Sequence, residues 1–213
     1  MTDTVKRPYD SSRRQEQAQQ TRATIIRAAH DLFLVNGYER TTIAEIATRA
    51  GVAVETVYAA FRNKRTLLRQ VWFVSFRGDE EDVRLLDRPQ IREVLAEPDL
   101  ATRLRAHAAV MTPVFRRMTP LLLTLRAAAS EPAAAAMLAE FDERCLDAAE
   151  TYARAAAATG QLATSESECR DVLWSTLDGA LWHRLVAERG WTDERFAAWL
   201  GQSWISSLVK PRP

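Results

Sequence analysis

Residues Thr41–Phe61, TTIAEIATRAGVAVETVYAAF, decide the fold of this chain because they read as two short helices joined by a tight turn. Thr42 and Glu45 have the spacing of a capping box, in which each side chain accepts the backbone N–H of the other residue. Gly51 stands where the chain leaves the first helix, and glycine adopts a positive φ there without penalty. The second helix is expected over Val54–Phe61. This layout is typical of a helix-turn-helix, whose second helix lies in the DNA major groove.

Apolar residues in both expected helices recur at helical spacing. They are Ile43, Ile46, Ala47 and Ala50 in the first helix, and Val54, Val57 and Phe61 in the second. A stripe of this kind is the buried face of a helix, which leaves small and hydroxyl-bearing side chains of the second helix outside. Two packed helices of an ordinary bundle show the same pattern, so the motif by itself leaves both interpretations open.

The flanking residues extend the pattern into a recognisable domain. Asn36-Gly37 closes an upstream helix, and Asn63 is a good N-cap for a helix that starts NKRTLL. The run from Ile25 to Leu68, AA-LF--NGY--TTI-EIA--AGV---TVY--F--K--LL, resembles the N-terminal DNA-binding domain of TetR-family transcriptional regulators. The resemblance implies an all-α fold with a three-helix DNA-binding domain and a larger helical domain. We expect a disordered arm over 1–12, the DNA-binding domain over 13–65, and an effector-binding and dimerisation domain over 66–210.

Residue types in the motif assign roles at a DNA interface. We assign Thr42, Tyr58 and Lys64 to phosphates, at positions that commonly contact the DNA backbone in TetR-like domains. Base reading is assigned to Val54, Glu55, Thr56 and Ala59, through cytosine N4 for the carboxylate and thymine methyls for the others. A core-edge aromatic at Tyr58 and a solvated charge at Glu55 remain alternatives. Ala53 replaces the usual capping serine, and Ala59-Ala60 replaces longer polar residues, so fewer side chains can reach base edges.

Charge is distributed unevenly along the chain. Residues 1–65 hold 11 Lys/Arg against 7 Asp/Glu, a net +4, whereas the remaining 148 residues hold 18 against 21, a net −3. A basic N-terminal end on a molecule of net charge +1 suits a phosphate-binding head on a regulatory body. The apolar content of 47%, with only 7 glycines and 8 prolines, predicts a mostly helical protein with a sizeable core.

The C-terminal two thirds predict a helical body. Prolines 89, 98, 113, 120 and 132 are expected to mark helix starts or kinks. One long helix is expected over about 133–158 and a second from the Ser165/Glu168 capping box to about residue 188, with a last helix from Thr192 to about Leu208. The resemblance implies that the two long helices form a homodimer interface, so that the dimer reads palindromic DNA. Gly179 would permit close helix approach there, or would accommodate local packing.

The resemblance also implies a small-molecule effector bound inside the body. The candidate ligand-binding residues are His107, Met111, Phe115, Leu122, Arg126 and Trp174, with Phe73 also placed to close a cavity. Their aliphatic and aromatic character favours an apolar or amphipathic effector. All of them except Arg126 can equally be ordinary core residues.

Other classes of protein find little support in the sequence. The three histidines lack metal-ligand spacing, and GxSxG, Walker A and GxGxxG are absent, so we expect no enzyme, no metal and no cofactor. No apolar run reaches the roughly 18–20 residues that span a membrane, and the N-terminus does not read as a signal peptide, so a cytoplasmic location is expected. Cys145 and Cys169 read as small buried hydrophobes, with a redox switch as the alternative.

The sequence therefore predicts a homodimeric repressor that binds double-stranded DNA and is released by an effector. Two alternatives remain open. One is a helical interaction protein whose helix-turn-helix-like segment only packs, and the other is a DNA-binding activator or nucleoid-associated factor.

Overall fold

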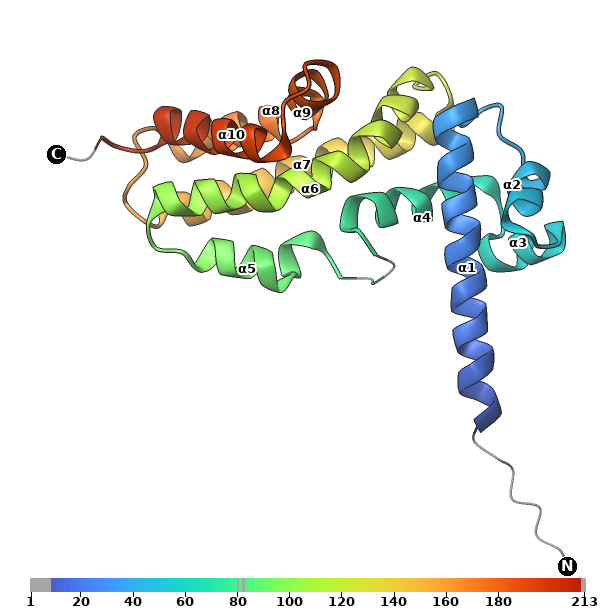
Figure 1. Ribbon diagram of the computed structural model, residues 1–213. Coiled ribbons are helices and arrows are strands. Elements are labelled where there is room, and N and C mark those ends of the chain that lie inside the picture. Colours follow the sequence, from blue (N-terminus) through green and yellow to red (C-terminus); the bar gives the residue numbers. More distant parts are fainter. Residues whose placement is uncertain (1–8, 80, 82, 212–213) are drawn as a thin grey trace, which may run out of the picture. The chain divides into compact units, whose positions relative to one another are not determined.

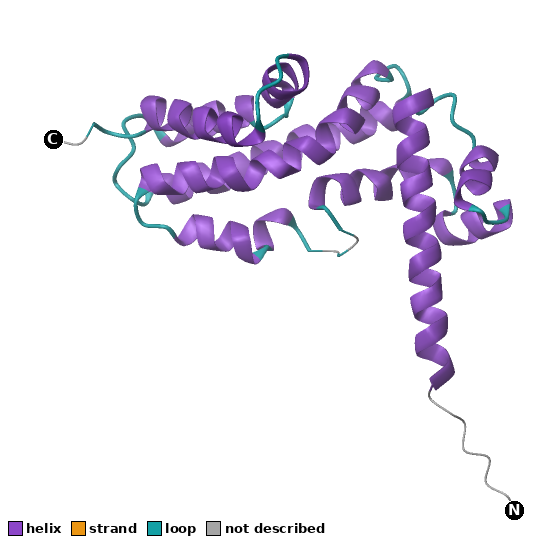
Figure 2. Cartoon of the chain, viewed as in Figure 1, coloured by secondary structure: helices purple, strands orange, loops and turns teal. Residues whose placement is uncertain are grey.

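The computed structural model describes residues 9–79, 81 and 83–211, and side chains from residue 13 onward (Figure 1). These residues contain helices and no named strand (Figure 2), which confirms the all-α prediction. The chain forms two compact units that divide between Val71 and Trp72, rather than at residue 65. Residues 1–8 of the expected disordered arm lie outside the described residues, and helix α1 begins at Tyr9.

The first unit contains three helices and the start of a fourth. They are α1 (Tyr9–Asn36), α2 (Ile43–Ala50), α3 (Val54–Phe61) and α4 (Lys64–Arg77), which runs on past Val71. Helix α2 packs against both α1 and α3. The core contains Ile25, Phe33, Ile46 and Phe61, all of which are fully buried. The two short helices predicted between Thr41 and Phe61 are confirmed as α2 and α3, and their buried residues Ile46, Ala47, Val57 and Phe61 pack into this core.

The second unit is a helical bundle built around one long central helix. Its elements are η1 (Leu85–Asp87), α5 (Pro89–Ala96), α6 (Leu100–Ala127), α7 (Pro132–Ala157), α8 (Glu166–Thr176), α9 (Ala180–Trp182), the π-helical turn η2 (His183–Glu188) and α10 (Asp193–Leu208). Helix α6 packs most extensively against α10 and also contacts α5, α7 and α9 (Figure 1). Helix α7 packs mainly against α8.

The prolines of the body take two kinds of position. Pro89 and Pro132 occupy the first helical position of α5 and α7, where the missing N–H costs nothing. Pro113 and Pro120 lie inside α6 and therefore do not start helices. Each of the two lacks the N–H that would close an i to i−4 hydrogen bond within that helix.

The expected long helix over 166–188 is wrong. The structure ends α8 at Thr176 and resumes at Ala180, because Gly179 adopts a left-handed conformation with φ of 77°. A Cβ at Gly179 would collide with the Thr119 side chain on α6. Asp178 caps the new start by accepting the N–H of Ala180 at 2.9 Å. Gly179 thus serves local packing against α6 rather than the middle of a straight dimer helix.

Candidate nucleic-acid interface and buried cavity

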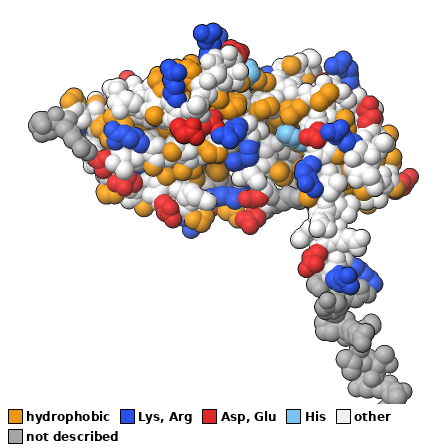
Figure 3. Space-filling view, viewed as in Figure 1, with side chains coloured by type: hydrophobic (Ala, Val, Ile, Leu, Met, Phe, Trp, Pro, Cys, Tyr) orange, Lys and Arg blue, Asp and Glu red, His pale blue; other side chains and the backbone are white. Residues whose placement is uncertain are grey.

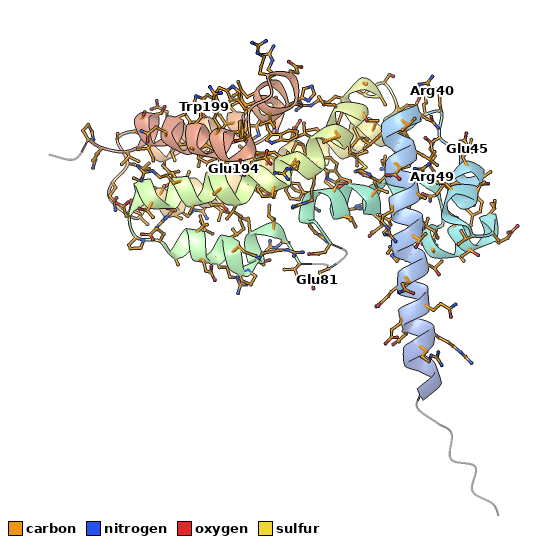
Figure 4. The ribbon with its side chains drawn as sticks, viewed as in Figure 1. Arg40, Glu45, Arg49, Glu81, Glu194 and Trp199 are labelled. Atoms are coloured by element: carbon orange, nitrogen blue, oxygen red, sulfur yellow. The ribbon has the colours of Figure 1, made fainter. Side chains whose placement is uncertain are left out.

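The first helix of the motif starts with a complete capping box. The N–H of Thr42 donates to Glu45 Oε2 at 2.7 Å, and the N–H of Glu45 donates to Thr42 Oγ1 at 3.2 Å. The hydrogen bond from the Thr42 backbone holds the pKa of Glu45 below its usual value, so the carboxylate stays charged. Glu45 and Arg49 of α2 are labelled in Figure 4. The capping prediction is confirmed.

The capping box occupies the hydrogen-bond donors that Thr42 would use to bind a DNA phosphate. Its hydroxyl also donates to Glu45 Oε2, at 2.9 Å, so both Thr42 donors already serve the carboxylate. The next backbone N–H groups of the first turn, those of Ile43 and Ala44, have no intrahelical partner by helix geometry. The assignment of Thr42 to a phosphate stays a prediction. It requires that the phosphate shares the Thr42 donors with Glu45 or accepts the N–H groups of Ile43 and Ala44 instead.

A tight turn joins α2 to α3. Gly51 takes φ of 68°, and its N–H and that of Val52 donate to carbonyls in the last turn of α2, as the sequence predicts. Helix α3 starts at Val54, and its N-cap residue Ala53 makes no side-chain capping hydrogen bond. The helix ends at Phe61, and the C-cap residue Arg62 has a φ of 62°, which is unusual for a side chain with a Cβ. Helix α3 is therefore short and has no side-chain cap at its start.

The two faces of α3 differ as expected. Val57 and Phe61 are buried against the core, while Glu55, Tyr58 and Ala59 are exposed. The other predicted base readers, Val54 and Thr56, are half-buried. Tyr58 has 49% of its surface accessible, which argues against the core-edge interpretation of this aromatic residue. The exposed face of α3 presents few long polar groups.

Lys64 lies at the start of α4 beside the turn between α1 and α2. Its ammonium group donates to the Glu39 carbonyl at 3.0 Å and lies 4.3 Å from the Tyr38 ring centre. These contacts hold the charge of Lys64 at the start of α4. Asn63 accepts the N–H of Thr66 at 2.8 Å, which confirms the predicted N-cap of α4.

A cavity of about 150 Å³ lies within the second unit, lined by residues of α4, α6 and α7, by Arg84, Leu85 and Leu86 at η1, and by Leu177. Four aromatic residues that line it are Trp72, Phe73, Phe76 and Phe141. The ring centres of Trp72 and Phe76 lie 5.1 and 6.3 Å from the ring centre of Phe141. Arg77 and Arg144 also border the cavity, and each places its guanidinium over the Phe73 ring. The cavity is thus mainly apolar, with two cations fixed on one of its walls.

One part of the cavity wall carries buried polar atoms. The rings of His107 on α6 and Tyr152 on α7 stack with centres 3.7 Å apart. Both residues are buried, and no described residue forms a hydrogen bond with either nitrogen of His107 or with the Tyr152 hydroxyl. Burial lowers the pKa of His107 to about 3 and raises the pKa of Tyr152. Both side chains are therefore neutral at pH 7.

The cavity contains only some of the residues predicted to bind an effector. His107 and Met111 line it, and so does Phe73. Phe115 instead packs edge-on against Phe196, and Leu122 is a core residue. Arg126 forms an ion pair with Asp178 at 3.0 Å, and Trp174 is exposed on α8. These last four residues do not line the cavity. Phe115, Leu122 and Arg126 lie on later turns of α6 than His107 and Met111, and Trp174 lies on α8.

Sequence reasoning missed the contribution of α7 to the cavity and, on α4, identified only Phe73. Phe141, Cys145, Ala148 and Tyr152 share one stripe of α7, and all four line the cavity. Their spacing also fits an ordinary core face, so only the aromatic cluster Trp72, Phe73 and Phe76 of α4 could have indicated that the stripe faces a cavity. Burial raises the pKa of the Cys145 thiol to about 12 and the pKa of the Cys169 thiol to about 11, which disfavours the reactive thiolates.

The described part of the chain also bears on other functions. It contains no group of three or more His, Cys, Asp or Glu side chains arranged to hold a metal ion. None of its helices is both long and apolar enough to cross a bilayer. On the face that Figure 3 shows, Lys and Arg side chains of the second unit alternate with Asp and Glu among hydrophobic residues.

Comparisons with known proteins agree with this geometry. A family model described as "Bacterial regulatory proteins, tetR family" matches residues 25–71. The HTH-type transcriptional regulator TtgR of Pseudomonas putida is 47% identical over 57 residues. That match spans 27% of this chain and only 27% of the length of TtgR.

Solved structures extend the likeness to nearly the whole chain. A structure titled as the SmeT–triclosan complex has a TM-score of 0.67 and 24% identity, over 91% of this chain and 98% of the other. NalD, described as the secondary repressor of the MexAB-OprM multidrug efflux pump in Pseudomonas aeruginosa, has a TM-score of 0.63 and 18% identity, over 92% and 100%. Residues 25–71 therefore match the model of tetR-family regulatory proteins, and the chain as a whole has the fold of these solved structures.

Proposed function

We propose that the protein is a transcriptional repressor that binds a palindromic operator as a homodimer and leaves it when a small molecule binds in the cavity. The observation that carries the proposal is the capped α2, the Gly51 turn and the exposed face of α3. NalD, a named repressor, has the same fold as this chain, which supports the repressor role at the level of the fold.

Contact with DNA phosphates is the better supported part of the interface. Tyr58 is exposed on α3, and Lys64 is held beside Tyr38 and the Glu39 carbonyl. An exposed hydroxyl on α3 and an ammonium group held at the start of the next helix fit a backbone-positioning role. Base reading falls to Glu55, Thr56 and Ala59 with Val54, and the short side chains suggest a specificity that also depends on DNA shape.

Dimerisation would supply the contacts that one short helix lacks. Leu146 on α7 and Trp174 on α8 are large apolar side chains with 37% and 43% of their surfaces exposed. The two helices pack together in the second unit, so one partner surface can cover both residues. Because α8 ends at Thr176, we centre the proposed interface on α7 and α8 and omit the turn that follows.

Effector control is supported by the cavity itself. Residues of α4 are part of its lining, and α4 is also the helix whose first turn carries Lys64. A molecule that binds better to one arrangement of these helices would shift the protein towards that arrangement. The SmeT structure with triclosan is an example of a small molecule bound by a protein of this fold.

A gel-shift titration tests the DNA-binding part. The purified protein is titrated against the DNA flanking its own coding region and against a random duplex, at several salt concentrations. Lys64→Ala is expected to weaken binding to all sequences and to lower the salt slope by about 1, since one phosphate contact is lost. Tyr58→Phe should weaken binding without that change in slope.

The matched control is Lys210→Ala, which removes the same charge from the end of the second unit. It should leave both affinity and slope unchanged. Equal affinities for the wild type and for both interface variants would refute the phosphate assignments. Binding to neither duplex at low salt would refute the proposal that the protein is a DNA-binding regulator.

A further inference from the structure

The adjacent rings of His107 and Tyr152 are the unusual feature of the cavity. Buried polar atoms in proteins nearly always have a hydrogen-bond partner, and each one without a partner carries a desolvation cost. Here three such atoms, two ring nitrogens and one hydroxyl, lie on two stacked side chains in the wall of one cavity. No described residue supplies their partners, so the partners must be molecules that enter the cavity, either water or a ligand.

The chemistry of these atoms specifies the group that would satisfy them. A neutral imidazole has one donor and one acceptor nitrogen, and a tyrosine hydroxyl can donate and accept. A hydroxyl group on the ligand can bond one of the two His107 nitrogens and also the Tyr152 hydroxyl, because it donates one hydrogen bond and accepts others. A carboxylate accepts only, so it could not supply a donor to the acceptor nitrogen of His107, and its partners in the cavity would be Arg77 and Arg144 instead.

The rest of the cavity specifies the body of the ligand. Its volume of about 150 Å³ equals that of the engineered lysozyme cavity that binds benzene, a general reference for one aromatic ring. Phe76 and Trp72 meet Phe141 edge-on, at interplanar angles of 79° and 81°, so the walls present both ring faces and ring edges. Such walls suit a flat aromatic ring.

We propose that the ligand of this cavity is an uncharged single-ring aromatic compound with a hydroxyl group, which bonds to His107 and Tyr152. The inference rests on the proposed effector role and names the chemical class that the role requires. Its hydroxyl would replace the water lost when the two side chains are buried, while the ring contacts the aromatic walls.

Calorimetric titration of the whole chain without DNA tests this class with three probes of similar size. Phenol carries the hydroxyl, toluene lacks it, and benzoate replaces it with an anion. We expect phenol to bind about tenfold more tightly than toluene, because toluene leaves the polar atoms unpaired. Benzoate should bind more weakly than phenol.

Two variants test whether Tyr152 and His107 cause the preference for phenol over toluene. Tyr152→Phe removes only a hydroxyl that has no partner among the described residues, so the fold should be retained. It should reduce the preference for phenol over toluene several-fold. His107→Phe should do the same, and a thermal melt of each variant verifies folding. Tyr38→Phe is the matched control, because it removes a tyrosine hydroxyl from the first unit and should leave the preference unchanged.

The outcomes separate this inference from the proposed function. Equal binding of phenol and toluene, tighter binding of benzoate, or no binding of any probe at millimolar concentration would overturn the proposed class. An unchanged preference for phenol in Tyr152→Phe would overturn it too. If phenol binds with the expected signature but does not release the protein from DNA, the chemical class stands and the effector role fails.

Discussion

Replacing Gly179 with alanine should destabilise the protein strongly, for two separable reasons. The backbone of Gly179 has φ of 77°, a conformation that costs about 1–2 kcal/mol for a residue with a Cβ. The added methyl would also collide with Thr119 Oγ1 and lie 3.3 Å from Met118 Cε. Overpacking of this kind adds about 1–3 kcal/mol, so the expected loss in unfolding free energy is about 3 kcal/mol.

Calorimetry and chemical denaturation would measure this loss. For a protein of this length a loss of about 3 kcal/mol corresponds to a fall in Tm of roughly 6–12 °C. Gly160→Ala is the matched control, because Gly160 has φ of 70° and its added methyl would meet no neighbour within 4 Å in the described part of the chain. It should show only the backbone cost, about 1–2 kcal/mol.

A second substitution tests the collision directly. Thr119→Ala removes the hydroxyl that the new methyl would meet, and that hydroxyl has no hydrogen-bond partner among the described residues. The double variant should therefore recover about 1–3 kcal/mol relative to Gly179→Ala alone. Equal losses for the Gly179 and Gly160 variants, with no recovery in the double variant, would refute the argument from close approach.

Three further predictions concern stability, and each is measured by chemical denaturation. Thr42→Ala removes the capping box and should cost about 1 kcal/mol; an unchanged midpoint would contradict the role of the cap. Arg62→Gly should stabilise by about 1 kcal/mol, because it relieves a positive φ of 62°, and a loss instead would show that the arginine side chain matters more. The Asp79 carboxylate accepts two hydrogen bonds from Arg88, which lowers the pKa of Asp79 in the folded state. The ion pair therefore stabilises the folded protein above the unfolded pKa of Asp79, about 3.9, and this stabilisation is lost as the pH falls through the lower folded pKa. Asp79→Asn should make the free energy of unfolding less dependent on pH in this acidic range. An unchanged pH dependence there would contradict this role.

The helix-turn-helix was predictable because local signals decide it. The Thr42/Glu45 capping box, the Gly51 turn and the apolar stripe each act within a few residues, and the structure confirms all three. The break at Gly179 was not predictable in this way. It depends on Thr119, which is 60 residues away in the sequence and becomes a neighbour only when α6 packs against the turn.

The cavity shows the same limit. His107 and Met111 could be placed on one face of a helix from their spacing, and both line the cavity. Phe115 continues that face by one more turn, yet Phe196 of α10 covers it. Periodicity identifies which residues leave the solvent, but it does not tell whether a neighbouring helix or an empty space receives them.

The unpaired polar atoms of His107 and Tyr152 also constrain how this sequence can change over generations. Each atom lowers the stability of the ligand-free protein, so mutations such as Tyr152→Phe should be favoured wherever selection acts on folding alone. Their retention would then record selection for recognition of a ligand. A laboratory population evolved for yield without any effector should lose these two polar side chains early, and with them its response.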